Sequence, residues 1–124
     1  MAKKKVAIVE DDLAISQMYR LKFEAEGYDV AVAENGQVGL EVIEGFRPDV
    51  VLLDMMMPQM NGDEVLKNMR SHDWGKDTPV LILTNMGKEE ASRSLESLNV
   101  HSYIVKAEMT PKQVAERVRV VLGG

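Results

Sequence analysis

Four apolar runs of this sequence end on side chains that can do chemistry. The first run ends on Glu10 and Asp11, and later runs end on Asp54, Thr84 and Lys106. In open parallel sheets of α/β proteins, ligands bind beyond the carboxyl ends of the strands. If these runs are parallel strands, the five side chains converge although they are far apart in the sequence. The pattern therefore predicts one site with three carboxylates, a hydroxyl and an ammonium.

The predicted site calls for a cation and suits phosphoryl chemistry. Two carboxylates ~4 Å apart repel by about 4 kcal/mol at an effective dielectric constant of 20, so either some are protonated or a cation is bound. Oxygen ligands without His or Cys favour a hard cation, Mg²⁺ above all. Lys106 and Thr84 suit the oxygens of a phosphoryl group. A carboxylate can act as the nucleophile, and Asp54 is the best placed; taken alone, it could equally begin a turn.

Apolar runs alternate with helical periodicity along the whole chain. The predicted strands are residues 6–9, 29–33, 49–54, 79–83 and 102–105, and the predicted helices are residues 13–26, 35–44, 62–71, 88–98 and 110–122. In the first helix, apolar side chains recur at Ala14, Met18, Leu21 and Ala25, the spacing of one helix face. Five strands alternating with five helices predict an α/β fold with a mainly parallel sheet covered by helices on both faces.

Several residues mark the ends of the predicted helices. Gly27 and Gly45 are placed to end the first and second helices. Asn35 can cap the second helix, and Thr110 with Gln113 forms a capping box for the last one. These signals set the helix boundaries independently of the apolar periodicity.

Length and composition describe an ordinary globular domain. The 124 residues are 45% hydrophobic and 28% charged, which predicts a single domain over residues 1–124. The chain has no cysteine, which excludes disulfides and thiolate sites and fits a reducing compartment. The apolar run after the first lysines is too short for a signal peptide or membrane span. The net charge of −5 argues against direct nucleic-acid binding, and we expect a cytoplasmic protein that contacts no membrane.

The motifs around these residues resemble the receiver domain of two-component response regulators, in particular the single-domain chemotaxis type. The matching pieces span the chain in order: Val-Glu-Asp-Asp at 9–12, Leu-Leu-Asp-Met-Met-Met-Pro at 52–58, Met-Asn-Gly at 60–62, Leu-Thr at 83–84 and Tyr-Ile-Val-Lys at 103–106. The resemblance implies a flavodoxin-like (βα)5 fold, a doubly wound parallel sheet of order 2-1-3-4-5 in three α/β/α layers.

The resemblance also implies roles for individual residues. Asp54 would be the phospho-acceptor, and Glu10, Asp11, Asp54 and the backbone carbonyl of Met56 would hold Mg²⁺. Thr84 and Lys106 would grip the phosphoryl oxygens beside Asp54, and these three residues would carry the phosphotransfer. Tyr103 would follow Thr84 as an aromatic switch.

The implied protein is a signalling switch rather than an enzyme, although it assists its own phosphotransfer and autodephosphorylation. Its phosphodonor would be a histidine kinase or a histidine phosphotransfer protein. Its target would read the face made by the fourth helix, the fifth strand and the fifth helix. The protein would be a monomer or a phosphorylation-dependent dimer.

The sequence departs from the family at three positions that concern the site. Lys106 is followed by Ala107, where the family usually has a proline, often in cis. A cis bond before a non-proline residue costs ~3 kcal/mol, so we expect either a trans bond with a shifted loop or a cis bond kept for Lys106. Met56 and Met86 stand at positions that tune hydrolysis of the phosphoaspartate. Neither side chain can orient a water molecule, so we expect slow self-dephosphorylation.

Three alternatives belong to different functional classes. A Mg²⁺-dependent phosphatase of the haloacid dehalogenase type usually has a second Asp two residues after its nucleophile, where this chain has Met56. A flavodoxin-like FMN-binding module needs a hydroxyl- and glycine-rich loop after the first strand, where this chain has acidic residues. A receiver fragment of a longer DNA-binding regulator fits the sequence as well.

Overall fold

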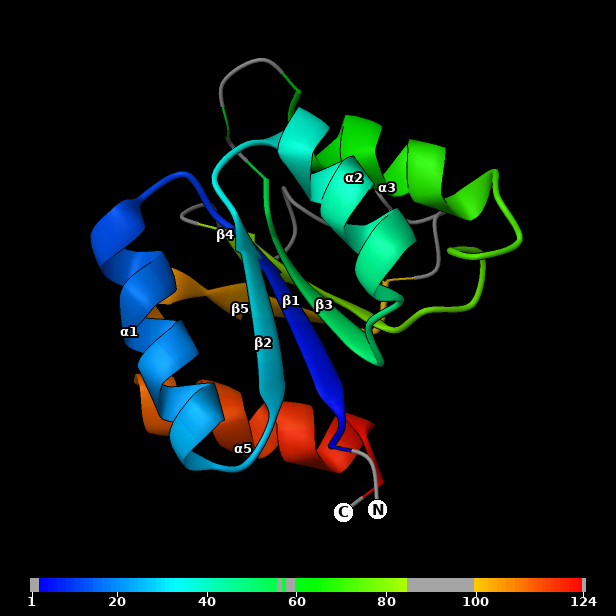
Figure 1. The fold of residues 1–124 in the computed structure, drawn as a ribbon. Helices are drawn as coiled ribbons and strands as arrows, with labels where there is room; N and C mark the ends of the chain where they lie inside the picture. Colours follow the sequence, from blue (N-terminus) through cyan, green and yellow to red (C-terminus); the bar gives the residue numbers. More distant parts are fainter. Residues whose placement is uncertain (1–2, 56, 58–59, 85–99, 124) are drawn as a thin grey trace.

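The computed structural model, which describes residues 3–55, 57, 60–84 and 100–123, is a parallel sheet between two layers of helices (Figure 1). The sheet has the order β2-β1-β3-β4-β5, as predicted. Its strands are β1 (Lys5–Val9), β2 (Asp29–Ala33), β3 (Val50–Asp54), β4 (Val80–Thr84) and β5 (Ser102–Val105). The helices are α1 (Leu13–Ala25), α2 (Gly36–Phe46), α3 (Gly62–Arg70), the short 3₁₀ helix η2 (Lys106–Glu108) and α5 (Pro111–Val121). The helix predicted for residues 88–98 lies outside the described residues.

The strand register brings the carboxyl ends of the strands to one edge of the sheet. Val9 pairs with Leu53, so the residues that follow, Glu10 and Asp54, begin the same edge. On the other side of β3, Asp54 pairs with Leu83, and Thr84 pairs with Val105. Parallel pairing is the reason that residues almost 100 positions apart in the sequence reach one place.

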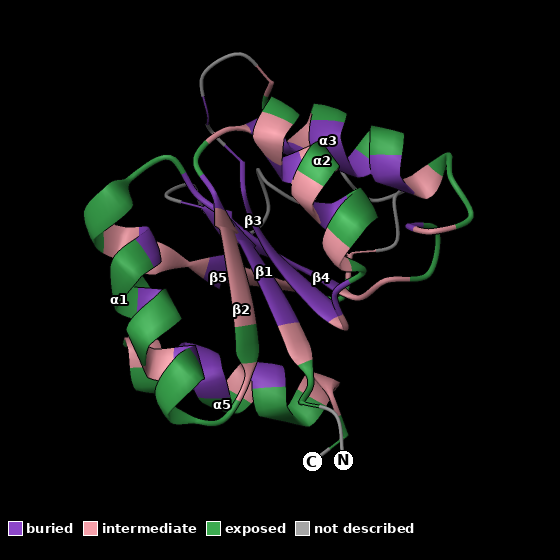
Figure 2. Cartoon of the chain, viewed as in Figure 1, coloured by how far each residue is buried: buried purple, intermediate pink, exposed green. Residues whose placement is uncertain are grey.

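The three central strands are buried on both faces, which divides the core in two (Figure 2). One cluster packs under α2 and α3 and includes Val51, Leu53 and Ile82. The other packs under α1 and α5 and includes Leu52 and Leu83. Alternate residues of one strand supply opposite clusters, so a continuous apolar run is what a sheet with helices on both faces requires.

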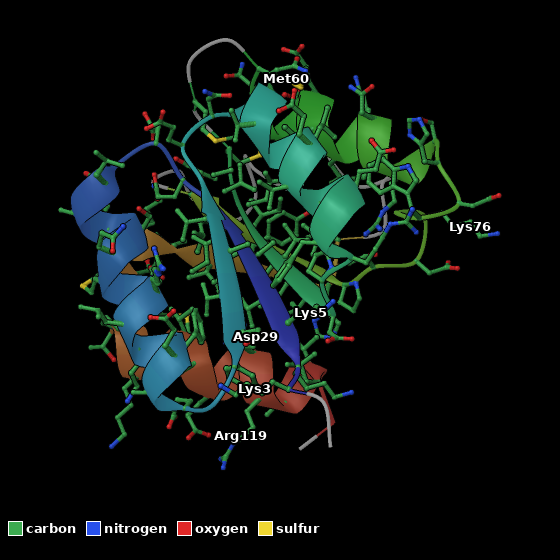
Figure 3. All side chains as sticks on the ribbon, viewed as in Figure 1. Lys3, Lys5, Asp29, Met60, Lys76 and Arg119 are labelled. Carbon is green, nitrogen blue, oxygen red and sulfur yellow. The ribbon has the colours of Figure 1, made fainter. Side chains whose placement is uncertain are left out.

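The side chains of both layers fill the space against the sheet (Figure 3). Met60 lies at the edge that holds the carboxyl ends of the strands, whereas Lys5 and Asp29 lie at the opposite edge. The predicted site belongs to the edge on which Met60 lies.

Helix ends follow the predicted signals in most places. Asn35 accepts a hydrogen bond from the Val38 N–H at 2.9 Å, and Thr110 and Gln113 form the expected capping box. Gly27, just after α1, has a φ of 95°. Gly45, however, does not end α2, because the helix continues to Phe46 and Arg47 takes the left-handed conformation there.

Helix α1 buries a different face from the one that its apolar periodicity marks. An apolar stripe at this spacing normally faces the core, yet Ala14, Met18, Leu21 and Ala25 are all exposed. The buried residues are Ser16, Tyr19 and Phe23. Burial of two large aromatic rings outweighs burial of a methionine, a leucine and two alanines, so the helix turns its aromatic face to the sheet.

Candidate functional site

Three carboxylates meet at the carboxyl edge of the sheet. Asp54 is the last residue of β3, Glu10 follows β1 directly, and Asp11 follows Glu10. Each offers an oxygen, and these oxygens all lie within 4.8 Å of one another. Glu10 is fully buried and Asp54 is 3% exposed, whereas Asp11 is open to solvent. The site is therefore a recessed acidic pair with a third carboxylate at its mouth.

Lys106 joins the two buried carboxylates. Its Nζ lies 2.5 Å from Glu10 Oε1 and 3.3 Å from Asp54 Oδ2. Burial by itself lowers the pKa of Lys106, but the hydrogen bond to Glu10 and the charge of Asp54 outweigh it, so the pKa is raised above its usual value. The ammonium therefore stays charged, and it is held between the two acids.

The backbone around the acids also contributes to the site. The Asp12 N–H donates to Glu10 Oε2 at 3.1 Å, while the Asp12 side chain caps α1 by accepting from the Ile15 N–H. At Gly62, a Cβ atom would lie 2.4 Å from the backbone oxygen of Asp54. We did not predict this close approach from the sequence, and the Asn-Gly pair that opens α3 was its only signal. Gly62 lets α3 begin directly against the end of β3.

The remaining predicted residues lie on neighbouring strands. Thr84 ends β4 and is fully buried, and Tyr103 is half-buried on β5 against the cluster under α2 and α3. The register puts Thr84 beside Val105, the residue before Lys106. Met56 and Met86 lie outside the described residues.

The backbone after β5 decides between the two expectations for the Lys106–Ala107 bond, trans or cis. No cis peptide bond occurs among the described residues, so this bond is trans. Lys106 begins the 3₁₀ helix η2 instead of ending an extended segment. The trans bond is thus compatible with a Lys106 side chain that reaches both acids.

The donor set fits a hard divalent cation. Three carboxylates carry a formal charge of −3 and Lys106 supplies +1, which leaves a net charge of −2 for this group. All the side-chain ligands are oxygens, the donors that Mg²⁺ prefers, and the exposed Asp11 leaves the mouth open to water. Glu10, Asp11 and Asp54 are the residues that would hold the ion.

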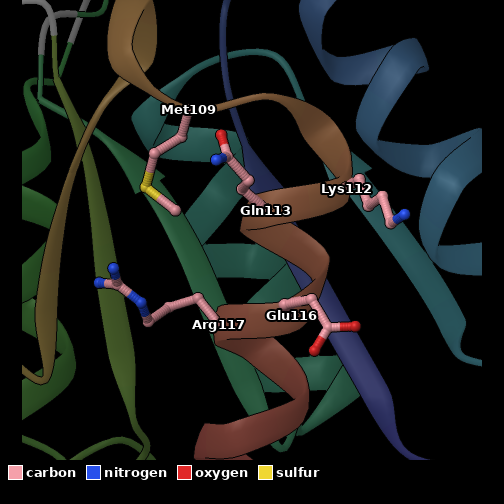
Figure 4. Close-up of a pocket in the computed structure, with 5 residues that line it drawn as sticks. All are labelled: Met109, Lys112, Gln113, Glu116 and Arg117. Carbon is pink, nitrogen blue, oxygen red and sulfur yellow. The ribbon is translucent and has the colours of Figure 1, made fainter.

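A second feature is an open pocket along α5 and Met109 just before it, and none of the three acids lines this pocket. Met109, Lys112, Gln113, Glu116 and Arg117 line an open pocket of about 470 Å³ (Figure 4). Its walls combine a methionine with charged side chains of both signs. Such a surface suits contact with another macromolecule better than it suits catalysis.

The tyrosine beneath the site is affected by the same charges. Tyr19 on α1 is almost fully buried. Burial raises its pKa, the charge of Lys106 opposes this, and Glu10 and Asp54 raise the pKa further. Tyr19 therefore remains a neutral phenol in the folded protein.

Comparisons with known proteins agree with this geometry. The family model of the response regulator receiver domain matches residues 6–119. The phosphate regulon transcriptional regulatory protein PhoB of Pseudomonas aeruginosa is 31% identical over 122 residues, which cover 98% of this chain and 53% of PhoB. The DNA-binding response regulator MtrA of Mycolicibacterium paratuberculosis is 35% identical over 94% of this chain and 50% of MtrA. The chain thus spans about half the length of these curated relatives.

A solved structure matches over nearly its full length. The chemotaxis protein CheY4 of Vibrio cholerae superposes with a TM-score of 0.90 at 30% identity, covering 97% of this chain and 99% of CheY4. Within the described residues, no helix has the length and apolar character to cross a membrane. With five parallel strands in the order 2-1-3-4-5 and acids at their carboxyl ends, the chain belongs to the receiver domain family of two-component response regulators, which are signalling proteins rather than conventional enzymes.

Proposed function

We propose that Asp54 accepts a phosphoryl group from a phosphohistidine of a histidine kinase or a histidine phosphotransfer protein. A carboxylate oxygen of Asp54 forms the new P–O bond, the P–N bond of the donor breaks, and the imidazole leaves with the electron pair. The observation that carries this proposal is the convergence of Glu10, Asp11 and Lys106 on Asp54. Phosphoryl transfer depends mainly on positioning and charge stabilisation, and this group of residues supplies both.

Lys106 and Thr84 have distinct parts in the transfer. Lys106 already lies 3.3 Å from Asp54 Oδ2, so its charge reaches the oxygen beside the incoming phosphoryl group. Thr84 ends the neighbouring strand and offers a hydroxyl to a phosphoryl oxygen. Glu10, Asp11 and Asp54, together with the backbone carbonyl of Met56, would hold Mg²⁺, which would add positive charge beside the phosphoryl group.

The phosphorylated state is transmitted through Thr84 and Tyr103 to the face of β5 and α5. A phosphoryl group that draws Thr84 inward changes the space into which the Tyr103 side chain can pack. Tyr103 is half-buried on β5, two residues before Val105. A protein target then reads this face, and the open pocket lined by Met109 and Arg117 supports a binding role there. This is a two-state switch that a local change of charge controls.

We further propose that residues 1–124 form one receiver domain that works in the cytoplasm. The family match over residues 6–119 and the single sheet shared by both clusters support one domain. The absence of cysteine fits a reducing compartment. The alternative of a receiver fragment within a longer DNA-binding regulator keeps the same phosphoryl chemistry and differs in the output.

Intact mass spectrometry tests the acceptor role. The protein is incubated with Mg²⁺ and acetyl phosphate, a small phosphodonor, alongside Asp54→Asn. We expect a gain of one phosphoryl group that requires both Mg²⁺ and Asp54. Asp73→Asn, an exposed change in the loop before β4, is the matched control and should be phosphorylated normally. Equal phosphorylation of Asp54→Asn would show that another residue is the acceptor.

A further inference from the structure

Helix α2 lies against two other segments of the chain through two glycines on its buried face, Gly36 and Gly39. A Cβ atom at Gly36 would clash with the backbone oxygen of Met60 and lie 2.7 Å from the Met60 Cβ. A Cβ atom at Gly39 would lie 2.8 Å from Cγ1 of Val9. Met60 accordingly lies beside the first turn of the helix (Figure 3). The absence of both side chains lets α2 approach β1 and the segment before α3 at the same time.

These two contacts lead to the two halves of the acidic site. Val9 ends β1 and directly precedes Glu10. Met60 stands two residues before Gly62, and a Cβ atom at Gly62 would clash with the backbone oxygen of Asp54. The segment that follows Asp54 is therefore held at its end by close packing of Gly62, and α2 holds it at Met60. Through its glycines, α2 sets the position of this segment relative to the end of β1.

A side chain at position 36 would displace the segment that contains Met60. Helix α2 is held in place at this end, because Gly39 packs against Val9 and Asn35 caps the first turn. The nearest atom to the added Cβ is a backbone oxygen, so the clash is relieved by movement of the Met60 backbone rather than by rotation of its side chain. Mg²⁺ requires nearly ideal octahedral geometry at about 2.0–2.1 Å, so its binding is sensitive to small shifts of this kind.

We propose that Gly36 is a positioning residue for the cation site. Its missing side chain lets α2 hold the Met60 backbone, and this contact keeps the segment after Asp54 at the distance from Glu10 and Asp11 that Mg²⁺ needs. Gly36 acts through Met60 and not by contact with the cation. The inference rests on the proposed function, in which Mg²⁺ binds beside Asp54, and it assigns the geometry of that site to a helix that supplies none of the three acids.

Titration calorimetry with Mg²⁺ and with Ca²⁺ tests the proposal in Gly36→Ala. The dissociation constant of Mg²⁺ should rise by about tenfold, the size of effect that supporting residues have on metal sites. That of Ca²⁺ should rise by about twofold or less, because Ca²⁺ tolerates irregular coordination. Gly45→Ala, a change on the same helix where a Cβ would meet nothing within 4 Å, should bind both ions like the parent.

The ratio of the two dissociation constants separates positioning from loss of stability, which would weaken both ions alike. An unchanged ratio in Gly36→Ala would overturn the positioning role and leave the proposed function intact. A parent protein that binds no Mg²⁺ would overturn the proposed cation site together with this inference.

Amide hydrogen exchange tests the same coupling in the parent protein, so the result does not depend on the folding of Gly36→Ala. If the first turn of α2 sets the geometry of the cation site, bound Mg²⁺ stabilises that turn by the same coupling free energy. The N–H groups of Val38 and Gly39 donate to Asn35 and report on the turn. Mg²⁺ should slow their exchange by about fivefold and leave the Arg47 N–H, at the other end of α2, unchanged. Unchanged exchange at Val38 and Gly39, or equal slowing at Arg47, would overturn the proposal.

Discussion

Lys106 neutralises only part of the charge that Glu10, Asp11 and Asp54 bring to the carboxyl edge. Two of these acids are buried, and each loses hydration that must be replaced. The ammonium between Glu10 and Asp54 replaces some of it, and the remaining negative charge favours a cation. The same residues therefore stabilise the resting protein and leave the edge with a net negative charge that a cation can offset.

Removal of the Lys106 charge should destabilise the protein in the absence of Mg²⁺. Lys106→Met keeps the length of the side chain but leaves Glu10 and Asp54 without their cation. Loss of one member of a buried ion pair costs about 3 kcal/mol, which urea unfolding would measure. Glu10→Gln added to Lys106→Met should recover part of the loss. If the free-energy changes of Lys106→Met and Glu10→Gln simply add in the double variant, Lys106 and Glu10 do not interact in solution.

Phosphorylated Asp54 should hydrolyse slowly. The side chains of Met56 and Met86 carry no group that can orient an attacking water by a strong hydrogen bond. Replacement of each by Asn or Glu should shorten the half-life of the phosphorylated protein, measured by loss of the phosphoryl mass after donor removal. Met18→Gln, a change on exposed α1, is the control. A parent half-life of seconds that these changes lengthen would contradict the prediction.

Tyr19 should make the folded protein sensitive to alkaline pH. Its pKa is raised above the usual 10.0 by burial first, with Lys106 opposing and Glu10 and Asp54 adding to the shift. The unfolded chain therefore loses this proton before the folded one. The contribution of protonated Tyr19 to the free energy of unfolding is complete below about pH 10. It is lost as the pH rises through the pKa of Tyr19 in the folded protein. Above pH 10, the free energy of unfolding should fall faster in the parent than in Tyr19→Phe; parallel curves would count against the shift.

At the scale of elements, helix α1 shows how packing overrides periodicity. Both faces of the helix have apolar spacing, but only the face with Tyr19 and Phe23 carries rings that reach the sheet. The ring centroid of Phe23 also lies 6.0 Å from that of Tyr28, the residue just before β2, in an edge-on arrangement. Tertiary contacts of this kind select one face, and the other face becomes surface.

Helix α2 offers a matched pair of glycines that separates packing from helix propensity. A Cβ at Gly39 would lie 2.8 Å from Cγ1 of the buried Val9, whereas a Cβ at Gly45 would meet nothing within 4 Å. Gly39→Ala should lower the free energy of unfolding by about 1–2 kcal/mol, because overpacking outweighs the gain in helix propensity. Gly45→Ala should raise it by about 0.5–1 kcal/mol. Urea unfolding measures both free-energy changes. Equal changes in the two variants would show that Val9 leaves enough room for a methyl group at position 39.

At the scale of the whole molecule, the two clusters share one sheet, so the site is coupled to the entire core. Leu53 belongs to the cluster under α2 and α3, Leu52 belongs to the cluster under α1 and α5, and Asp54 follows them directly. A ligand that binds the edge of the sheet therefore binds only the folded state. Such binding stabilises the whole domain by linkage.

Mg²⁺ should accordingly raise the free energy of unfolding. At 100 times its dissociation constant, the gain is about 2.7 kcal/mol. The gain should shrink in Asp11→Asn, which removes a carboxylate ligand that is open to solvent, and persist in Asp73→Asn. Thermal unfolding with and without Mg²⁺ measures the difference. An equal gain in Asp11→Asn and the parent would place the ion elsewhere.

The sequence by itself determined the strands, most helix ends and which side chains gather at the carboxyl edge of the sheet. Apolar runs that end on Asp54 and Thr84 carry their own signal, because buried strands are continuous and the sites of parallel sheets lie beyond their carboxyl ends. The capping residues Asn35 and Thr110 act within a few positions of themselves. Local interactions of this kind can be read from neighbouring residues alone.

Only the tertiary structure decided which face of α1 is buried, that Gly39 and Gly62 sit against neighbouring backbone and side chains, and that the Lys106–Ala107 bond is trans. These features depend on contacts between segments far apart in the sequence. The competition between the two faces of α1 is settled by the area that each can bury against the sheet, and that area exists only when the sheet and α5 are in place. The exposed apolar stripe of Ala14, Met18, Leu21 and Ala25 is the result of that competition.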